Sequence, residues 1–205
     1  MNLVIMGPIG SGKGTQAGII SKKLGIPHIS TGDIMRKHIK DETDIGLKIK
    51  QKLETGSYVD DTLTSEILKS RIFKDDVKNG FILDGFPRTI NQANILSEMV
   101  AIDKVIFLNV DNDIVIDRIS SRLTCEECGA MYSKSSAIQK CEKCGGNLSQ
   151  RKDDKKEVVE NRLEIFEKET LPILNFYKSL NLLVEINGML EIDVVTDIIL
   201  KELVI

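Results

Sequence analysis

Short apolar runs alternate with stretches of helical periodicity along most of the chain. Nearly continuous apolar runs are typical of strands buried on both faces of a parallel sheet. Such runs predict strands at residues 2–6, 27–30, 81–84, 104–110 and 182–186. Helical patterns occupy residues 13–24, 31–54, 61–76, 89–100, 112–123, 154–180 and 190–203. Because strands alternate with helices, the sequence predicts an α/β fold: a doubly wound, parallel, five-stranded sheet with helices on both faces.

Two stretches interrupt this alternation. Residues 31–73 hold consecutive helical patterns without a clear strand, and residues 124–150 are rich in Cys, Gly, Ser and Lys but poor in large apolar residues. Neither stretch is typical of a sheet core, so we expect both to be excursions from one central domain. The expected core consists of residues 1–30, 60–122 and 151–205. The expected excursions are a helical insert at 31–59 and a small lid at 123–150.

Composition and charge exclude several classes of function and location for this protein. The chain has 205 residues, of which 41% are hydrophobic and 29% charged, as in an ordinary globular protein. Its 28 Lys and Arg against 31 Asp and Glu give a net charge of −3, whereas sequence-independent nucleic-acid binders usually have a basic excess. No apolar run approaches the roughly 18 residues that span a bilayer, and no basic leader precedes the first strand. We therefore expect a cytoplasmic protein that binds neither nucleic acid nor membrane.

A glycine-rich motif directly follows the first predicted strand. It reads Gly7-Pro8-Ile9-Gly10-Ser11-Gly12-Lys13-Gly14-Thr15. Its glycines allow successive N–H groups to surround a phosphate, and the following helix directs its positive end at the same anion. The Lys13 ammonium can reach the β- and γ-phosphates. The alternative is a glycine-rich turn with a solvated lysine, but the strand before the motif and the helix after it favour a phosphate-binding loop, even though Gly14 occupies the place usually held by Ser or Thr.

A second group of polar residues follows the strand at 81–84. Asp84 closes that strand, at the edge of the sheet where open α/β folds bind ligands. A carboxylate there suits Mg²⁺, through water because Mg²⁺ dehydrates reluctantly. Arg88 has a planar fork matched to phosphate, and Gln92 has the donor and acceptor that an adenine edge requires. The alternative is that Asp84 only forms a turn and that Arg88 is a surface charge. If both the loop at 10–15 and Arg88 bind phosphates of reacting nucleotides, they must face the same crevice.

Arginines lie on both sides of the cysteine-rich segment. Arg118 and Arg122 precede it at i, i+4 spacing, on one face of the helix predicted at 112–123. Arg151 follows the segment directly, and Arg162 comes later, on the next predicted helix. Arginines at helical spacing usually form a solvated face. Arg122 and Arg151, however, bracket the segment on both sides, and this position predicts that they lie at its hinges.

The four cysteines occur in two copies of one turn. They are Cys125, Cys128, Cys141 and Cys144, and each Cys-x-x-Cys pair is followed by glycine. Two such turns can place four thiolates around one ion, and four thiolates form a closed tetrahedral Zn²⁺ site with a structural role. A segment of this size has too little core to fold alone, and a metal supplies what packing cannot. The alternatives are four reduced thiols or two disulfides.

Together these motifs resemble those of the adenylate kinases and the related nucleoside-monophosphate kinases. The matching segments are GKGTQ in the phosphate loop, STGDIMR from Ser30, DGFPRT from Asp84, DRxxxR from Asp117 and RxDDxxExVxxRL from Arg151. The cysteine-bearing lid is similar to that of some adenylate kinases, notably from Gram-positive bacteria. The resemblance implies reversible transfer of a phosphoryl group from Mg·ATP to AMP to give ADP. It also implies Mg²⁺ with ATP, structural Zn²⁺, and a monomer whose lid closes to exclude water.

The resemblance also implies roles for particular residues. The implied ATP-binding residues are Gly10, Ser11, Gly12, Lys13, Gly14, Thr15, Arg118, Arg122, Met131, Tyr132 and Leu190, the last through its backbone. The implied AMP-binding residues are Thr31, Arg36, Ser57, Tyr58, Val59, Gly85, Phe86, Pro87, Arg88, Gln92, Arg151 and Arg162. The implied catalytic residues are Lys13, Asp84, Arg88, Arg122, Arg151 and Arg162. The chain departs from the family at Ile9, usually Pro, and at Tyr58 and Asp60, where the family usually reads G-x-L-V-P-D.

Three other functions are alternatives to this interpretation. A UMP- or CMP-type kinase is the nearest, but such relatives typically have Ala at the position of Thr31, and Gln92 also favours AMP. A zinc-ribbon nucleic-acid-binding ATPase belongs to a different class, and the acidic charge balance argues against it. The third alternative is a nucleotide-binding regulator without turnover, which an assay of ADP formation from AMP and ATP would distinguish from a kinase.

Overall fold

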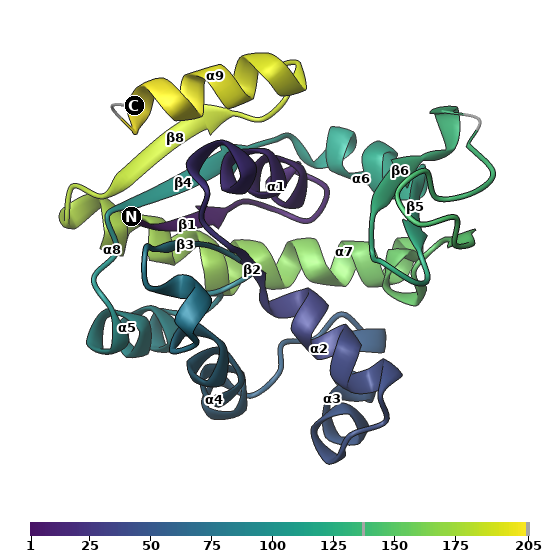
Figure 1. Ribbon diagram of the computed structural model, residues 1–205, viewed down its shortest axis with the longest axis horizontal. Coiled ribbons are helices and arrows are strands. Elements are labelled where there is room, and N and C mark those ends of the chain that lie inside the picture. Colours follow the sequence, from purple (N-terminus) through teal and green to yellow (C-terminus); the bar gives the residue numbers. More distant parts are fainter. Residues whose placement is uncertain (137, 204–205) are drawn as a thin grey trace.

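The central element of the protein is a parallel sheet of five strands in the order β2-β3-β1-β4-β8 (Figure 1). The computed structural model describes residues 1–136 and 138–203, except the side chain of Ser135. The strands are β1 Asn2–Met6, β2 His28–Ser30, β3 Phe81–Asp84, β4 Lys104–Asn109 and β8 Leu183–Asn187. The predicted α/β fold with a doubly wound sheet is therefore confirmed, and each strand end lies within one residue of its prediction.

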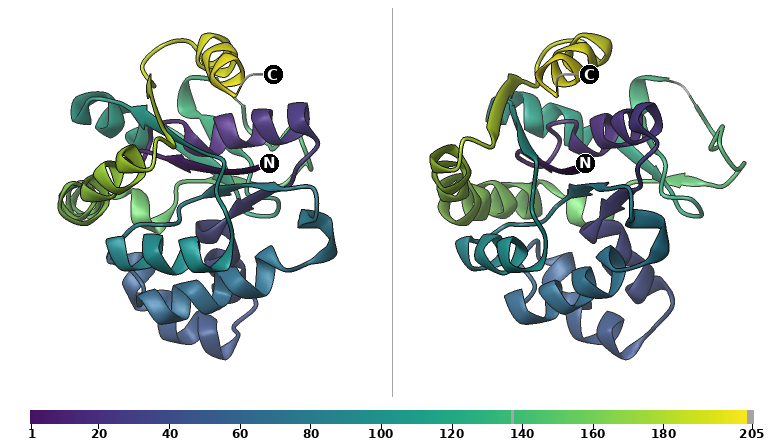
Figure 2. Two further views of the ribbon diagram at one scale, coloured as in Figure 1. Left: turned by 90° about the vertical axis from the view of Figure 1, so that its left-hand side faces the viewer. Right: turned by 60° about the vertical axis from the view of Figure 1, so that its left-hand side comes forward.

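Helices cover both faces of this sheet. They are α1 Lys13–Leu24, α2 Thr31–Lys40, α3 Asp44–Glu54, α4 Asp61–Ile72, α5 Ile90–Met99, α6 Asn112–Ser120, α7 Lys156–Ile165, α8 Leu171–Ser179 and α9 Ile192–Glu202. Figure 2 shows purple α1 and yellow α9 on one side of the sheet, and the blue and teal helices α4 and α5 on the other. The molecule thus has the three layers expected of an α/β fold.

Successive residues of β1 point to opposite faces of the sheet, as strand geometry requires. Leu3 and Ile5 pack with Ala17 and Ile20 of α1 and with residues of α9. On the other face, Val4 and Met6 pack with residues of α4, α5 and α8. Each of these apolar side chains is almost fully buried, and burial of one such side chain contributes roughly 1.5–3 kcal/mol. The core therefore holds the carboxyl end of β1, and the phosphate loop that follows it, in a fixed place.

The helical stretch predicted at 31–54 is two helices rather than one. Helix α2 begins after Ser30, whose hydroxyl accepts a hydrogen bond from the Asp33 N–H, and α3 begins after Thr43, whose hydroxyl accepts from the Gly46 N–H. Such caps satisfy backbone donors that have no partner within a helix. Between the helices Glu42 adopts a left-handed conformation, with φ of 49°, which breaks the helical path. The two helices pack on α4 around a small apolar cluster of their own, made of Met35, Ile49, Val59 and Ile67.

A small antiparallel sheet, separate from the central one, lies beyond α6 and α7 (Figure 1). Its strands are β5 Arg122–Cys125, β6 Met131–Ser133 and β7 Leu148–Ser149. The prediction of a helix over 112–123 is wrong at its end, because α6 stops at Ser120 and Arg122 pairs with Ser133 in the sheet. The hydroxyls of Ser120 and Ser121 bond back to the carbonyls of Asp117 and Arg118, which competes with continuation of the helix. Arg118 and Arg122 therefore do not share a helix face.

Two other helical predictions were too long, because α4 ends at Ile72 and α9 begins at Ile192. The stretch predicted at 154–180 is helical without a break from Lys156 to Ser179, with a π-helical segment, Phe166–Thr170, between α7 and α8. Residues 204–205 of the expected core and residue 137 of the expected lid lie outside the described residues. Among the helices that the structure describes, none combines the length and apolar character needed to cross a membrane.

Candidate active site

The phosphate loop joins the central strand β1 to helix α1. Gly12 adopts a left-handed conformation at the start of α1, with φ of 93°, and only glycine does so without strain. The Lys13 ammonium folds back over the loop, 2.7 Å from the carbonyl oxygen of Pro8 and 3.5 Å from Ser11 Oγ. Burial lowers the pKa of Lys13 to about 8; the nearby Asp84 raises it, and Arg88, Arg162 and Arg122 lower it. A bound anion would remove this penalty on the charged lysine.

One large cavity contains both halves of the expected site. Its volume is about 840 Å³, which is within the range of small-molecule sites. Gly7 and residues 9–16 of the phosphate loop and early α1 line it, as do Asp84 and Arg88. The phosphate loop and Arg88 therefore face the same crevice, as phosphoryl transfer requires. Every predicted ATP-binding residue lines this cavity: Gly10, Ser11, Gly12, Lys13, Gly14, Thr15, Arg118, Arg122, Met131, Tyr132 and Leu190.

Asp84 lies at the carboxyl end of β3, beside the phosphate loop. Its Oδ2 atom is 3.4 Å from His28 Nε2, and a Cβ placed on Gly14 would lie 3.6 Å from the same oxygen. The carboxylate is close enough to Lys13 to raise the pKa of that lysine. A hard carboxylate oxygen next to a phosphate-binding loop is the kind of group that holds hydrated Mg²⁺. The residues present therefore fit a magnesium ion that arrives with a nucleotide.

The turn after β3 holds Arg88 by its own neighbours. Gly85 has a positive φ of 83°, and its carbonyl accepts a hydrogen bond from Arg88 Nε at 2.7 Å. The peptide bond between Phe86 and Pro87 is cis, and the Phe86 side chain is buried in the core. The backbone N–H of Arg88 donates to Gln92 Oε1 at 2.8 Å, and Gln92 Nε2 donates to Asp61 Oδ1 at 2.7 Å. Because an amide has a second N–H and a second lone pair, Gln92 can still bond to a base.

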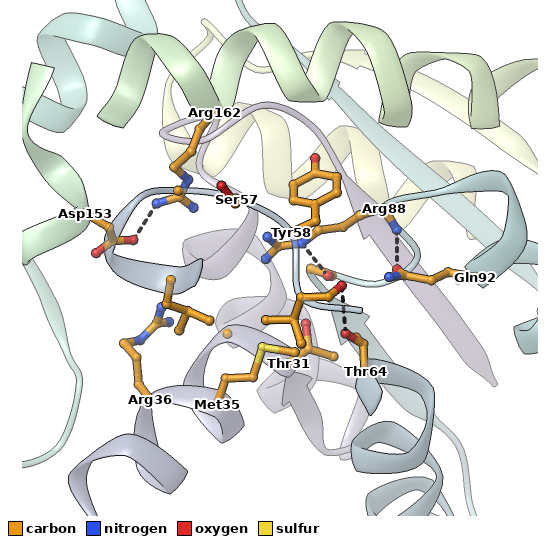
Figure 3. A pocket seen from close by; sticks show the side chains of 15 residues that line it. Thr31, Met35, Arg36, Ser57, Tyr58, Thr64, Arg88, Gln92, Asp153 and Arg162 are labelled. Atoms are coloured by element: carbon orange, nitrogen blue, oxygen red, sulfur yellow. Dashed lines mark hydrogen bonds and ion pairs between the residues drawn. The ribbon is translucent and has the colours of Figure 1, made fainter. Parts of the chain in front are cut away.

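A smaller pocket adjoins the large cavity (Figure 3). Both are lined by Gly32, Arg36, Tyr58, Gly85, Arg88 and Arg162. The predicted AMP-binding residues that line the smaller pocket are Thr31, Arg36, Ser57, Tyr58, Val59, Gly85, Arg88, Gln92 and Arg162; Phe86, Pro87 and Arg151 line only the larger one. The volume of the smaller pocket is about 40 Å³, far below the roughly 300 Å³ of the smallest ligand sites. A nucleotide would therefore require the pocket to open.

Carboxylates hold the arginines that surround the cavity. Arg122 forms a two-pronged ion pair with Asp154, in which Nε lies 2.9 Å from Oδ2. Arg162 Nη1 lies 2.5 Å from Asp153 Oδ2 (Figure 3). Although burial raises the pKa of Asp153, Arg162 and other arginines hold it below its usual value. Both carboxylates lie just before α7, where they hold one arginine of the small sheet and one of α7 itself.

Arg151 differs from the other arginines of the cavity in the state of its Nε atom. Within the part of the chain that the structure describes, its Nε atom is buried without a hydrogen-bond partner. Burial, followed by the charges of Arg36 and Arg122, lowers the pKa of Arg151 to about 10, and burial also lowers that of Arg162 to about 10. Several cations thus repel one another around the cavity. Such an arrangement favours a ligand with several negative charges.

The large cavity also has apolar lining residues. Met131 lies directly over the phosphate loop, since a Cβ on Gly14 would come within 2.9 Å of its Cε atom. Leu190 is 41% exposed and lines the same cavity, as does Ile192. Arg118 Nη1 donates to the carbonyl of Gly188 at 3.0 Å, which places the arginine beside the loop that joins β8 to α9. Met131, Leu190 and Ile192 thus add apolar surface to the cavity, and apolar surface suits the flat face of a base.

The four cysteines converge on one point in the small sheet. Their sulfur atoms all lie within 4.8 Å of one another, with 3.5 Å between Cys125 and Cys144 and between Cys128 and Cys141. A Zn–S bond of about 2.3 Å places tetrahedral sulfurs about 3.8 Å apart, so the cluster fits zinc. All four are free thiols, which contradicts the disulfide alternative.

Tyr132 links this cluster to the large cavity. Its hydroxyl accepts a hydrogen bond from the Glu142 N–H at 3.0 Å and lies 3.3 Å from Cys141 Sγ. The hydrogen bond from Tyr132 lowers the pKa of the Cys141 thiol. The same residue lines the cavity beside Met131. Cys128 of the cluster lines the cavity too, so the cysteine cluster borders the expected nucleotide site directly.

The sequence did not reveal every residue of the site. His28 and Thr170 line the large cavity without belonging to a recognised motif. Asp153 and Asp154 were part of the pattern after Arg151, but no role followed from it. Their ion pairs with Arg122 and Arg162 could be recognised only in the folded protein, because each arginine is distant in sequence or lies on another element. Thr170 had no signal, since it lies inside an unbroken helical pattern.

Comparison with known proteins adds an independent finding. The family model described as adenylate kinase matches residues 5–182. The adenylate kinase of Syntrophotalea carbinolica is 44% identical over 212 residues, with 99% of this chain and 98% of that protein covered. The adenylate kinase of Clostridium tetani is 45% identical, with 93% of each chain covered. That of Bacillus cytotoxicus is 46% identical, with 94% of each covered.

Proposed function

The chain belongs to the adenylate kinase family, and from this premise we propose how its own residues carry out the family's reaction. An adenylate kinase moves a phosphoryl group reversibly from Mg·ATP to AMP and yields ADP. The single observation that supports our account is that the phosphate loop and Arg88 line one cavity. Two nucleotides bound at those places would meet through their phosphates, without crossing a wall of the protein.

The donor nucleotide would occupy the side of the cavity formed by the phosphate loop. Backbone N–H groups of residues 10–15 and the positive end of α1 would hold its phosphates, and Lys13 would turn from the Pro8 carbonyl towards them. The base would lie between Met131 and Leu190, with Arg118 beneath it. Magnesium bound to ATP supplies charge neutralisation and alignment of the phosphates, and Asp84 would hold it through water.

The acceptor nucleotide would occupy the smaller pocket. Arg88 and Arg36 enter this pocket from different elements, and each has the planar fork that suits a phosphate (Figure 3). Thr31, Gln92 and the wall at 57–59 would contact the nucleoside. Arg36 is currently paired with Asp33, so AMP would compete with that carboxylate for the guanidinium.

The remaining arginines would act on the moving phosphoryl group. Phosphoryl transfer needs alignment and positive charge more than covalent chemistry from the protein. Arg122, Arg151 and Arg162 approach the cavity from β5, from the end of the small sheet and from α7. Arg151, with its unpaired buried Nε, is the cation most clearly prepared for an anion. A positive ring of this kind stabilises charge that develops on the transferred group.

Residues 31–59 and 123–150 would move as the nucleotides bind. The smaller pocket is too small for AMP as it stands, so the insert must open to admit it. The two excursions touch in this structure through Lys40, whose ammonium lies 3.2 Å from both the Glu126 carbonyl and Glu127 Oε2. Closure of such elements excludes water, which would otherwise hydrolyse ATP.

The cysteine cluster would hold a structural Zn²⁺. The small sheet has short strands of two to four residues and few buried apolar side chains apart from Cys125 and Cys141. A closed four-thiolate site would supply the missing stability and keep Met131 and Tyr132 over the donor site. Metal analysis of the purified protein tests this directly, with one zinc per chain expected.

The assay that tests the function compares four acceptors. With Mg·ATP as donor, we expect AMP to be phosphorylated far faster than UMP, CMP or GMP. If a pyrimidine nucleotide is turned over faster than AMP, the acceptor is UMP or CMP and the assignment of AMP is wrong. Absence of any ADP formation, with ATP still bound, would favour a nucleotide-binding regulator. We also infer a monomer in the cytoplasm, to be tested by light scattering and by cell fractionation.

A further inference from the structure

Arg88 is held from two sides that belong to different parts of the chain. Its own turn supplies two hydrogen bonds, one from Nε to the Gly85 carbonyl and one from the backbone N–H to Gln92. Two further contacts come from residues distant in sequence: the ring of Tyr58 and the hydroxyl of Thr170. Figure 3 shows Tyr58 standing beside Arg88 at one side of the smaller pocket.

The distant contacts form a directional chain of hydrogen bonds. Thr170 Oγ1 lies 2.9 Å from the carbonyl oxygen of Arg88, and a carbonyl can only accept. The single hydroxyl proton of Thr170 is therefore committed to Arg88. Tyr58 Oη lies 2.8 Å from the same Oγ1, so Tyr58 must be the donor in that pair. The order is Tyr58 to Thr170 to the carbonyl of Arg88.

The Tyr58 ring contacts the other end of the same arginine. Arg88 Cζ lies 5.3 Å from the centroid of the ring, within the distance of a cation–π contact. One side chain thus touches the guanidinium directly and the backbone of Arg88 through Thr170. Among the described residues, the hydrogen bonds of Arg88 use Nε and the backbone, so both Nη atoms can bind an anion.

A local irregularity of the helix brings Thr170 to this place. Residues Phe166–Thr170 form a π-helical segment, in which the Leu171 N–H donates to the Phe166 carbonyl. π-helical turns are rare and frequently occur at functional sites. Here Thr170 is almost fully buried, although its side chain is polar, and both neighbours of its hydroxyl belong to the site. A buried hydroxyl with a donor and an acceptor in place is fully used and therefore fixes its surroundings.

We propose that Tyr58 and Thr170 are positioning residues for Arg88, which together aim its guanidinium at the phosphate of the acceptor nucleotide before that nucleotide binds. The inference rests on the proposed role of Arg88 in binding AMP. This role is additional to the place of Tyr58 in the wall at 57–59, because it acts through Arg88 and not through the nucleoside. Tyr58 belongs to the loop between α3 and α4, whereas Thr170 follows α7, so the arrangement also ties the wall of the acceptor pocket to the core.

The test separates the ring of Tyr58 from its hydroxyl. Tyr58→Phe keeps the ring and breaks the chain of hydrogen bonds; we expect kcat/KM for AMP to fall about two- to tenfold while KM for ATP stays constant. Tyr58→Leu removes both contacts, and a fall of about tenfold or more is expected. Thr170→Val should lower kcat/KM for AMP as much as Tyr58→Phe does. Thr170→Ser keeps the hydroxyl, so its kcat/KM for AMP should stay close to that of the wild type.

A double-mutant cycle and a matched control complete the experiment. Tyr58→Phe combined with Thr170→Val should be no worse than the poorer single variant, because both changes interrupt one chain. Tyr177→Phe is the control, since the buried Tyr177 hydroxyl has no hydrogen-bond partner among the described residues, and its kcat/KM should equal that of the wild type.

Three results would overturn the inference: wild-type kcat/KM for AMP in Tyr58→Phe, an equal rise of KM for ATP, or no rescue by Thr170→Ser. Arg88→Ala distinguishes this failure from that of the proposed function. If Arg88→Ala leaves AMP binding by calorimetry unchanged, the assigned role of Arg88 is wrong. If Arg88→Ala loses AMP binding and the Tyr58 variants do not, only the positioning role is wrong.

Discussion

The Asp154 carboxylate is completely buried against the Arg122 guanidinium, although the two residues lie on opposite sides of the cysteine-rich segment. Arg122 begins the small sheet, and Asp154 lies just before α7. Their two-pronged pairing therefore closes the base of that segment. It also fixes an arginine to which we assign a role in phosphoryl transfer.

Removal of the Asp154 charge should destabilise the protein. Asp154→Asn would leave the guanidinium of Arg122, whose side chain is only 14% exposed, without its partner. Breaking a buried pair in this way costs about 3–5 kcal/mol of unfolding free energy. Urea unfolding measures the change. The control is Asp75→Asn, in the exposed pair with Lys78, which should change stability by less than about 1 kcal/mol. Equal effects of the two changes would contradict the structural role of Asp154.

Binding of Mg·ATP should take up protons near pH 8. The pKa of Lys13 is lowered to about 8 in the free protein, chiefly by burial, so about half of this lysine is uncharged at that pH. Phosphates favour the charged form and raise the pKa again, so binding adds about half a proton. At pH 6.5 Lys13 is already protonated in the free protein, so binding of Mg·ATP adds no proton to this lysine.

Calorimetry in two buffers of different ionisation enthalpy measures this uptake. Lys13→Arg is the control, because its guanidinium stays charged at both pH values. The wild type should take up more protons than Lys13→Arg at pH 8 and the same number at pH 6.5. An equal number at pH 8 would show that Lys13 keeps its proton in the free protein.

Tyr132→Phe should weaken the hold of the cysteine cluster on metal. The Tyr132 hydroxyl lies 3.3 Å from Cys141 Sγ and is fixed by the Glu142 N–H. Loss of such an outer hydrogen bond typically lowers metal affinity about 10- to 100-fold. Equilibrium competition for zinc with a chromophoric chelator, measured without nucleotide, reports the affinity. Tyr177→Phe serves as the matched control. A zinc affinity equal to that of the wild type would mean that the hydroxyl does not support the metal site.

Asp61→Ala should disturb the acceptor pocket more than the donor site. The Asp61 carboxylate accepts hydrogen bonds from Thr89 Oγ1 at 2.8 Å, Asn91 Nδ2 at 3.0 Å and Gln92 Nε2 at 2.7 Å. Its loss frees Gln92 and the N–H of Arg88 that Gln92 holds. A hydrogen bond to a charged group contributes about 1.5–3 kcal/mol. Since only a part of this free energy is lost from AMP binding, we expect KM for AMP to rise about three- to tenfold and KM for ATP to stay constant.

The neighbouring Asp60 offers the control for that experiment. Asp60 caps α4 by accepting from the N–H groups of Thr62 and Leu63, and it makes no contact with Gln92 in the hydrogen bonds described. Asp60→Ala should lower the unfolding free energy by about 1 kcal/mol without a change in KM for AMP. A rise in KM for both variants would indicate a general loosening of α4 instead.

Features that depend on a few consecutive residues were predictable without the structure. Strand β1, the glycine-rich loop and the start of α1 follow one another along the chain, so their order and spacing carry the information. The same holds for the cysteine turns, since two intervening residues suffice to bring two sulfurs together. The boundaries of the moving parts and the role of each site residue stay predictions.

Contacts between distant residues required the folded chain. Arg122 and Asp154 are 32 residues apart, and Tyr58 and Thr170 are 112 apart, so no local spacing indicates that they meet. The end of α6 was mispredicted for the same reason, because Arg122 pairs with Ser133 across the small sheet and that pairing overrides a helical pattern. Periodicity records which face of an element is apolar; it does not record which other element will cover that face or which polar groups will lie opposite one another after packing.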